Sequence, residues 1–390
     1  PSYFSKSKGC YVYDIKNKKY IDMIMGIGTN ILGYSNTKIN KKIKSIIDKG
    51  IMSTLNAPEE YLLAQKMLKI NKWADQVKFA RGGGEANAIA IRIARAYSKK
   101  DNVAFCGYHG WHDWYLSANL NNKNNLNKHL LKGIKISGVP NNLKNTSFPF
   151  EYNKIEKLEN IINKKKIAAV KMEVVRNLQP KHDFLNKVQK LCKKKKIVLI
   201  FDECTSGFRQ TFGGIHKLYG VEPDIAIYGK SLGNGHPISA IVGKSKIMQL
   251  ANSSFISSTF WSERVGFVAA LSTLELMEKE KSWKYITKLG FKIRSKWEEL
   301  AKKNLIKINI SGIPAISSFS FNQNNDLYKT LITQEMFKNG YIANNSVYVS
   351  TTHNQKILKN YYKIIDNCFS LIKKHELKKI DIKRILKSKT

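Results

Sequence analysis

The sequence is poor in acidic residues and in prolines, and its cysteines form no paired motif. The chain of 390 residues has 29 Asp and Glu, 8 Pro and 5 Cys. Because the cysteines are scattered without a C-x-x-C pair, the pattern indicates neither a disulfide framework nor a zinc site, and we expect no bound metal. No run of eighteen or more apolar residues occurs, which argues against a membrane protein. These absences predict a cytoplasmic protein.

The shortage of acidic residues leaves a large excess of positive charge. Lys and Arg number 67, and the formal net charge is +38. A surplus of this size is typical of proteins that bind a polyanion, because each neutralised phosphate releases counterions. The lysines are spread along the whole chain, however, and lack the interleaved aromatic residues of a single-strand groove. We therefore favour a solvated basic surface without a nucleic-acid partner, and keep nucleic-acid binding and a general attraction of anionic substrates as alternatives.

The segment at residues 228–237, YGKSLGNGHP, contains a Gly-Lys-Ser triplet of the kind that ends a nucleotide-binding phosphate loop. That loop has the pattern G-x-x-x-x-G-K-[ST], and with Gly229 as its second glycine the first would fall at position 224. The residue there is Asp224, a carboxylate where the backbone must curl around an anion. The pattern therefore argues against a triphosphate site, and Lys230 needs another explanation.

The middle of the chain alternates short apolar runs with helical patterns, which favours βαβ units and a largely parallel sheet. The expected strands are QVKFA (76–80), NVAFC (102–106), IAAVKM (167–172), IVLIF (197–201) and DIAIY (224–228). An Ala- and Ile-rich helix, EANAIAIRIARAYS, is expected shortly after the first strand. Ligands of such sheets bind beyond the carboxyl ends of the strands, so the residues that follow each strand are the candidates for a site.

The residues at these strand ends form a chemically coherent set. They are Gly82, Gly83 and Gly84, then Gly107 and Tyr108, then Glu173, Asp202, Gly229 and Lys230. Glycines at a helix N-terminus let backbone N–H groups approach a phosphate, and an aromatic ring can lie against a planar heterocycle. A buried carboxylate needs a cation, for which a protonated pyridine nitrogen would serve, and a lysine amine can form a Schiff base with an aldehyde. Together these features predict a pocket for pyridoxal 5′-phosphate (PLP).

Each feature taken alone also fits a structural role. The glycines could form a tight turn, Tyr108 could belong to the core, Asp202 could cap the following segment, and Lys230 could lie at the surface. Their occurrence in this order at successive strand ends favours the cofactor pocket.

Motifs over nearly the whole chain resemble those of fold-type I, class III aminotransferases, which are PLP-dependent enzymes. The N-terminal hairpin of that family resembles KGCYVYDIKNKKYIDM, its phosphate loop and helix resemble FARGGGEANAIAIRIAR, and its aromatic segment resembles GYHGWHDW. The family signature is similar to LIFDECTSGFR followed by YGVEPDIAIYGKSLGNGHPISA, and this match is the most specific. Within the class, the chain is most similar to the glutamate-1-semialdehyde aminomutases and related aminotransferases.

The resemblance implies a role for each matching residue. Lys230 would form the Schiff base, Asp202 would face the pyridine nitrogen and Tyr108 would stack on the ring, so these three are the expected catalytic residues. The other expected cofactor contacts are the amides of Gly83 and Gly84, Glu173, Cys204 on the opposite ring face, and Thr259. Because Thr259 belongs to a segment that reaches across the dimer in this family, it would bind the phosphate of the neighbouring subunit, which implies a homodimer with shared active sites.

Residues that would contact the substrate are less clearly marked. The loop HGWHDWY (109–115) carries Trp111 and His112, which we expect either at a substrate wall or in an aromatic loop at the subunit interface. No motif places an arginine for a substrate carboxylate, and Arg176 and Arg209 are the candidates.

Three departures from the family pattern bear on activity. Gly82 and Gly84 stand where the family usually has serine and threonine, so two hydroxyl donors to the phosphate are absent. The stretch after Glu173 lacks the proline that often follows. The segment YIANNSVYVSTTH (341–353) keeps the S-x-x-H ending but lacks the acidic residue that the aminomutases carry just before it. We therefore expect amino transfer between an amine or amino-acid donor and a carbonyl acceptor, with intramolecular transfer by a glutamate-1-semialdehyde 2,1-aminomutase as the alternative.

The expected architecture is the α/β fold of type I PLP-dependent transferases. A large PLP-binding domain with a mainly parallel sheet would span residues 40–265. A smaller α+β domain would combine residues 1–39 with residues 266–390.

Overall fold

The structure is a computed structural model that describes residues 3–129 and 133–387. The chain divides into two compact units, one of Lys41–Glu275 and one that combines Pro1–Asn40 with Leu276–Thr390. The expected second domain boundary, between residues 265 and 266, falls inside helix α10 (Arg264–Glu280), and the two units divide this helix between them.

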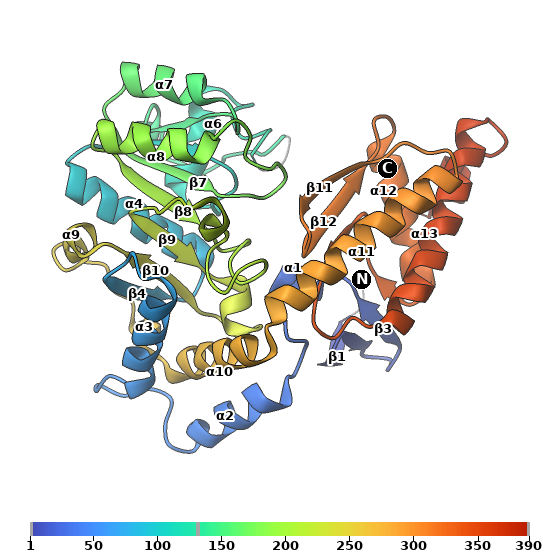
Figure 1. Ribbon diagram of the computed structural model, residues 1–390, viewed down its shortest axis with the longest axis horizontal. Helices are drawn as coiled ribbons and strands as arrows, with labels where there is room; N and C mark the ends of the chain where they lie inside the picture. Colours follow the sequence, from blue (N-terminus) through green and yellow to red (C-terminus); the bar gives the residue numbers. More distant parts are fainter. Residues whose placement is uncertain (1–2, 130–132, 388–390) are drawn as a thin grey trace. The chain divides into compact units, whose positions relative to one another are not determined.

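The large unit is built on a seven-stranded sheet (Figure 1). In spatial order its strands are β4 (Gln76–Ala80), β10 (Ser239–Gly243), β9 (Ile225–Tyr228), β8 (Val198–Asp202), β7 (Ile167–Glu173), β5 (Asn102–Cys106) and β6 (Ser147–Pro149). Strand β10 is antiparallel to both of its neighbours, and the other pairs are parallel. Strands β7, β8 and β9 are buried along their whole length, as strands covered on both faces are. The predicted α/β fold with a mainly parallel sheet is therefore confirmed.

Helix α4 (Gly83–Ser98) covers the middle of this sheet and packs against β4, β7, β8, β9 and β10. Its alanines and isoleucines form one core with Val103, Ile200 and Ile227 from the strands. The helix begins three residues after the end of β4, and β4 runs in the same direction as β9 because both are antiparallel to β10. The N-terminus of α4 therefore lies at the edge of the sheet where the parallel strands end.

Amphipathic helices complete the large unit. Helices α7 (Ile155–Lys164) and α8 (Phe184–Lys194) pack on each other, and on β5 and β8 respectively, with their apolar residues buried and many of their lysines exposed. The other helices in this part of the chain are α2 (Thr37–Ile47), which continues from the small unit, α3 (Pro58–Ile70), α5 (Asp113–Leu116), α6 (Ala118–Asn121) and α9 (Ser245–Met248).

The small unit combines both ends of the chain. Its four-stranded sheet has the order β1 (Phe4–Lys8), β2 (Tyr11–Asp14), β3 (Lys19–Asp22) and β13 (Tyr341–Ile342), and the parallel β3–β13 pair joins the N-terminal hairpin to the C-terminal part. A three-stranded sheet consists of β11 (Asn309–Ile313), β12 (Ile316–Ser320) and β14 (Ser346–Tyr348). Its helices are α1 (Met25–Gly28), α11 (Ser282–Lys303), α12 (Asn325–Lys338), α13 (Gln355–Glu376) and α14 (Ile382–Ile385). Among the described residues of both units, no helix is long and apolar enough to cross a membrane.

Candidate active site

The carboxylate at the end of β8 is buried, and each of its two oxygens has a hydrogen-bond partner. Asp202 is 3% exposed, its Oδ1 accepts a hydrogen bond from the Cys204 backbone N–H at 3.1 Å, and its Oδ2 lies 2.9 Å from Nδ1 of His109. Burial by itself would raise the pKa of the Asp202 carboxyl, but the charge of Lys171 and the hydrogen bond with His109 lower that pKa below its usual range. Asp202 is therefore a buried anion, able to hold a cation.

His109 was not predicted from the sequence, and its side chain is fully buried. The second ring nitrogen, Nε2, lies 3.2 Å from the carbonyl oxygen of Cys106, and burial lowers the pKa of the imidazole. Only part of the signal for it lay in the sequence. A carboxylate at the end of an apolar strand needs a partner. His109 directly follows Tyr108, in the segment after strand β5.

Lys230 follows β9 and is held in a left-handed backbone conformation, with φ of 38°. Its Nζ donates to Oγ1 of Thr205 at 3.1 Å. Burial, followed by the positive charge of Arg209, lowers the pKa of Lys230 below that of an exposed lysine. A larger fraction of this amine is therefore neutral at moderate pH, which is the form that reacts with a carbonyl group.

The glycine triplet forms the N-terminus of α4. Gly82 is the extended residue before the helix, and its N–H donates to the Glu85 carboxylate at 2.8 Å. The N–H groups of Gly83 and Gly84 have no acceptor in the described part of the chain, as first-turn amides of a helix commonly do not. A helix N-terminus with open amides and small side chains suits an anion such as a phosphate.

Cys204 lies between the glycine triplet and the segment that carries Lys230. A Cβ atom built on Gly83 would lie 3.2 Å from the Cys204 Sγ, and one built on Gly229 would lie 3.3 Å from it. The thiol therefore fills the space between these two glycines. Burial raises the pKa of Cys204 well above its usual value, so the side chain is an uncharged packing group here.

Tyr108 and Glu173 meet at the ends of β5 and β7. The Tyr108 backbone N–H donates to Oε2 of Glu173 at 3.0 Å, and the same oxygen lies 3.3 Å from Nη1 of Arg176. The Arg176 guanidinium also lies over the Tyr108 ring, 5.5 Å from its centroid. Gly107 has φ of +111°, and a Cβ there would lie 2.7 Å from the Glu173 carboxylate, so this close approach requires a glycine.

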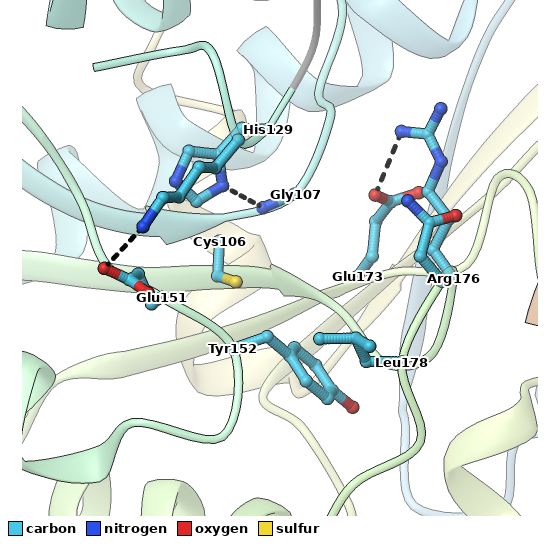
Figure 2. A pocket seen from close by; sticks show the side chains of 10 residues that line it. Cys106, Gly107, His129, Glu151, Tyr152, Glu173, Arg176 and Leu178 are labelled. Carbon is cyan, nitrogen blue, oxygen red and sulfur yellow. Dashed lines mark hydrogen bonds and ion pairs between the residues drawn. The ribbon is translucent and has the colours of Figure 1, made fainter. Parts of the chain in front are cut away.

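A cavity of about 190 Å³ opens beside this pair. Figure 2 shows Glu173 and Arg176 on one side of it and His129 and Glu151 on the other, with Tyr152 between. His129 accepts a hydrogen bond from the Gly107 N–H at its Nδ1 (3.2 Å). Space for a small ligand is therefore present next to the strand-end residues.

Three of the four candidate substrate residues lie apart from this cavity. Trp111 and His112 line a second cavity, of about 620 Å³, over the outer face of α4, with Trp261 and Phe255. Arg209 is fully buried, and its Nε donates to the Thr205 carbonyl oxygen at 2.6 Å. Only Arg176 of the four lines the cavity beside Glu173.

Thr259 is exposed at the start of a short 3-10 helix, Thr259–Ser262. Within the described residues, the Thr259 hydroxyl makes no hydrogen bond to the glycine triplet of its own chain. Its expected role concerns a neighbouring subunit, and it stays a prediction. No group of three or more His, Cys, Asp or Glu side chains between residues 3 and 387, apart from the undescribed 130–132, is arranged to hold a metal ion.

Residues 1–361 match the family model of class III aminotransferases. The chain belongs to this family. Among relatives of this aminotransferase, a 3-aminobutyryl-CoA aminotransferase of Cloacimonas acidaminovorans is 32% identical over 345 residues, 86% of this chain and 79% of that protein. A glutamate-1-semialdehyde 2,1-aminomutase of Sulfurisphaera tokodaii is 30% identical over 383 residues, 92% of this chain and 90% of that protein.

Solved structures show the same fold for this aminotransferase. The Sphingopyxis sp. MTA144 FumI protein, solved in its PLP internal aldimine form, has a TM-score of 0.87 and 21% identity, and the match covers 98% of this chain and 91% of that one. The ornithine aminotransferase of Toxoplasma gondii has a TM-score of 0.82 and 19% identity, with 96% and 92% covered. The predicted family and the predicted fold type are therefore confirmed, and the activity is that of a class III PLP-dependent aminotransferase or aminomutase.

Proposed function

We propose that this protein transfers an amino group between an amine or amino-acid donor and a carbonyl acceptor, with PLP held as a Schiff base on Lys230. One arrangement carries the proposal. A lysine with a lowered pKa, a buried anionic carboxylate and open helix amides come together at one edge of the sheet. These are an amine, an anion and an anion-binding end, which match the aldehyde, the ring nitrogen and the phosphate of PLP.

The residues that hold the cofactor in this proposal come from four strand ends. Asp202 contacts the ring nitrogen, the amides of Gly83 and Gly84 bind the phosphate, and Tyr108 and Cys204 lie against the two ring faces. Glu173 supports Tyr108 through the backbone hydrogen bond described above. When bound, PLP supplies an aldehyde that joins to amines and a ring that withdraws electrons.

The protein's own contribution to the chemistry is then charge placement and proton transfer. Asp202 stays anionic and favours a protonated ring nitrogen. With PLP bound and its Schiff base transferred to a substrate amine, the freed Lys230 amine would be the base that moves a proton between the substrate carbon and the cofactor carbon on the other side of the shared nitrogen. The lowered pKa of the Lys230 amine suits this role, because the base must be neutral before it accepts a proton.

Arg176 is the best-placed candidate to bind a substrate carboxylate. Its guanidinium lines the cavity beside Glu173 and covers the Tyr108 ring, so a carboxylate bound there would sit next to the proposed cofactor. Trp111 and His112 remain proposed as residues of a substrate wall or of the subunit interface. Arg209 is the weaker candidate for binding a substrate carboxylate, because it is buried.

We also propose a homodimer with shared active sites. The large unit exposes big apolar side chains, among them Phe255 at 90%, Leu55 at 83% and Phe260 at 67% of their surface. Apolar surface of this kind commonly marks an interface. Phe255 and Phe260 flank Thr259 in sequence, which supports burial of this segment, and with it Thr259, against a second copy.

The decisive experiment for the cofactor is borohydride reduction. We expect the purified protein to be yellow, and reduction followed by peptide mass spectrometry to find the pyridoxyl adduct on Lys230. The Lys230→Ala variant should retain the fold and carry no adduct. A colourless protein that takes up no PLP, yet binds nucleic acid with steep salt dependence, would support the nucleic-acid alternative instead.

Intramolecular transfer by a glutamate-1-semialdehyde 2,1-aminomutase is the second candidate, because a relative of that activity matches nearly the full chain. A screen of amine donors and carbonyl acceptors distinguishes the aminotransferase from the aminomutase. The readout is the colour change of the bound cofactor. We expect transfer that needs both a donor and an acceptor. Isomerisation of glutamate-1-semialdehyde at a useful rate, with neither added, would favour the aminomutase.

A further inference from the structure

Strand β7 carries a lysine in the buried interior of the sheet. Lys171 is fully buried, and its Nζ has no hydrogen-bond partner anywhere in the described part of the chain. Its register neighbours are apolar, Phe105 on β5 and Ile200 on β8. An ammonium group without a partner is costly at such a depth, so its presence calls for an explanation.

Lys171 shares one face of the sheet with the acidic end of the proposed cofactor site. Side chains alternate between the faces of a strand, so Lys171 points to the same face as Glu173, two residues further along β7. Glu173 is in register with Asp202 at the end of β8. Helix α4, which packs on β7, contributes apolar core residues to this face. The titratable groups coupled to Lys171 are Asp202, Cys204, Glu173 and His109.

The cluster contains two groups that can supply the positive charge opposite Asp202. A neutral His109 can donate to only one of its two acceptors, Asp202 and the Cys106 carbonyl, whereas an imidazolium would donate to both. The pKa of His109 is nevertheless lowered by burial, and the charge of Lys171 lowers it further. Burial also lowers the pKa of Lys171, to about 8, so at neutral pH Lys171 is mostly charged, and Asp202 is the charge that acts on it most strongly.

We propose that Lys171 is a positioning residue that competes with a protonated ring nitrogen for the charge of Asp202, so that the site holds its cofactor more tightly once Lys171 has lost its proton. The proposal rests on the PLP function proposed above. Glu173 is paired with Arg176, so Asp202 would face both cations, and one carboxylate cannot fully neutralise two cations where water is excluded. Binding of a protonated pyridine ring beside Asp202 therefore moves a proton from the Lys171 ammonium to solvent, and the net charge of the cluster stays the same.

The test uses pyridoxamine 5′-phosphate as the probe. This ligand has the ring nitrogen and the phosphate but no aldehyde, so it forms no Schiff base with Lys230. Binding to the cofactor-free full chain is measured by calorimetry from pH 7 to pH 9, in two buffers of different ionisation enthalpy, which gives both the affinity and the number of protons released. The variant is Lys171→Met, which keeps length without charge. Lys78→Met is the matched control, because Lys78 lies on β4 of the same sheet and Asp202 is not among the charges acting on it.

At pH 7 we expect Lys171→Met to bind the probe roughly tenfold more tightly than the parent and to release about one proton fewer. At pH 9 the two affinities should converge, because Lys171 is then neutral in the parent as well. Lys78→Met should follow the parent throughout. Equal proton release and equal pH dependence in the parent and Lys171→Met would overturn the proposal.

Two further outcomes are separable. If Lys171→Met does not fold, the proposal is tested with the parent protein and a second ligand. This ligand is the 1-deaza analogue of the probe, whose ring has carbon in place of nitrogen. We expect the parent to release about one proton more with the probe than with this analogue at pH 7, and equal release would overturn the proposal. If the parent binds neither the probe nor PLP, the proposed function itself fails and the role of Lys171 fails with it. Binding of PLP with no effect of Lys171 leaves the proposed function intact and refutes only this inference.

Discussion

Asp202 is held by donors from two segments, the Cys204 backbone N–H and the His109 ring, and this support separates its structural role from its chemical one. We expect Asp202→Asn to fold, because the amide has nearly the same shape and can keep an oxygen toward one donor. The ring nitrogen of the cofactor would lose the negative charge that favours its protonated form. If this weakens stabilisation of the substrate carbanion by roughly 3 to 5 kcal/mol, proton transfer should slow by about two to three and a half powers of ten.

Single-turnover kinetics with the coloured cofactor measures this effect, and absorbance of the cofactor on Lys230 reports binding separately. Asp224→Asn is the matched control, because Asp224 is a carboxylate at the opposite end of the neighbouring strand, where it accepts from Lys244 and the Leu199 N–H. Turnover of Asp202→Asn within a few-fold of the parent would show that Asp202 does not face the ring.

At the scale of elements, the N-terminus of α4 lacks the hydroxyl donors usual in this family, and the backbone at Gly82 can accept one. Gly82 has an ordinary extended conformation, with φ of −94°, and an added Cβ would lie 3.6 Å from its nearest neighbour, the Glu85 carboxylate. We expect Gly82→Ser to strengthen PLP binding by several-fold up to roughly tenfold, because the hydroxyl can donate to the phosphate. The measurement is the PLP dissociation constant. Gly82→Ala isolates the effect of the Cβ, and a serine variant no better than the alanine variant would place the phosphate elsewhere.

Strand β7 gives a prediction that needs no cofactor. The pKa of Lys171 is lowered by burial from 10.5 to about 8 in the folded chain, so between these values the unfolded chain binds more protons than the folded one. The free energy of unfolding of the cofactor-free protein should therefore rise with pH from about 8 to about 10.5, by at most about 3 kcal/mol from this group. Denaturant titrations of the parent and of Lys171→Met over that range measure it. The slope from this group should be missing in the variant, and identical slopes would show that burial does not lower the pKa of Lys171.

The positions of strand ends could be predicted from the sequence, because each strand end follows a single apolar run, whereas the roles of the residues there stay predictions. Lys230, Asp202 and Glu173 follow apolar runs that became β9, β8 and β7, and the parallel direction of these strands brings the three residues to one edge. His109 and Lys171 were missed for a physical reason. Whether a histidine in a loop or a lysine in a strand faces a carboxylate depends on the pairing of strands from separate parts of the sequence, and one lysine among many in so basic a chain carries no signal of burial.

At the scale of the whole molecule, the question is whether one chain completes a site by itself. The large unit brings together the lysine, the carboxylate and the helix amides, whereas Thr259 lies exposed next to Phe260. Mass measurement in solution should find a dimer, and Phe260→Asp should shift it toward monomer, since a charge in an apolar interface is unfavourable. A monomeric parent would contradict the shared site directly.

Complementation between two defective chains tests whether the active sites are shared. Lys230→Ala removes the Schiff-base lysine, and Thr259→Ala removes the proposed phosphate donor to the partner. In a mixed dimer of these variants, one site has neither residue, but the other has both, because the Lys230→Ala chain still supplies Thr259 to its partner. We therefore expect differently tagged chains, refolded together and purified as mixed dimers, to bind PLP with the parent's affinity at half of their sites. If Thr259 acted within its own chain, no site of the mixed dimer would be complete, and every remaining site would show the weaker affinity of Thr259→Ala.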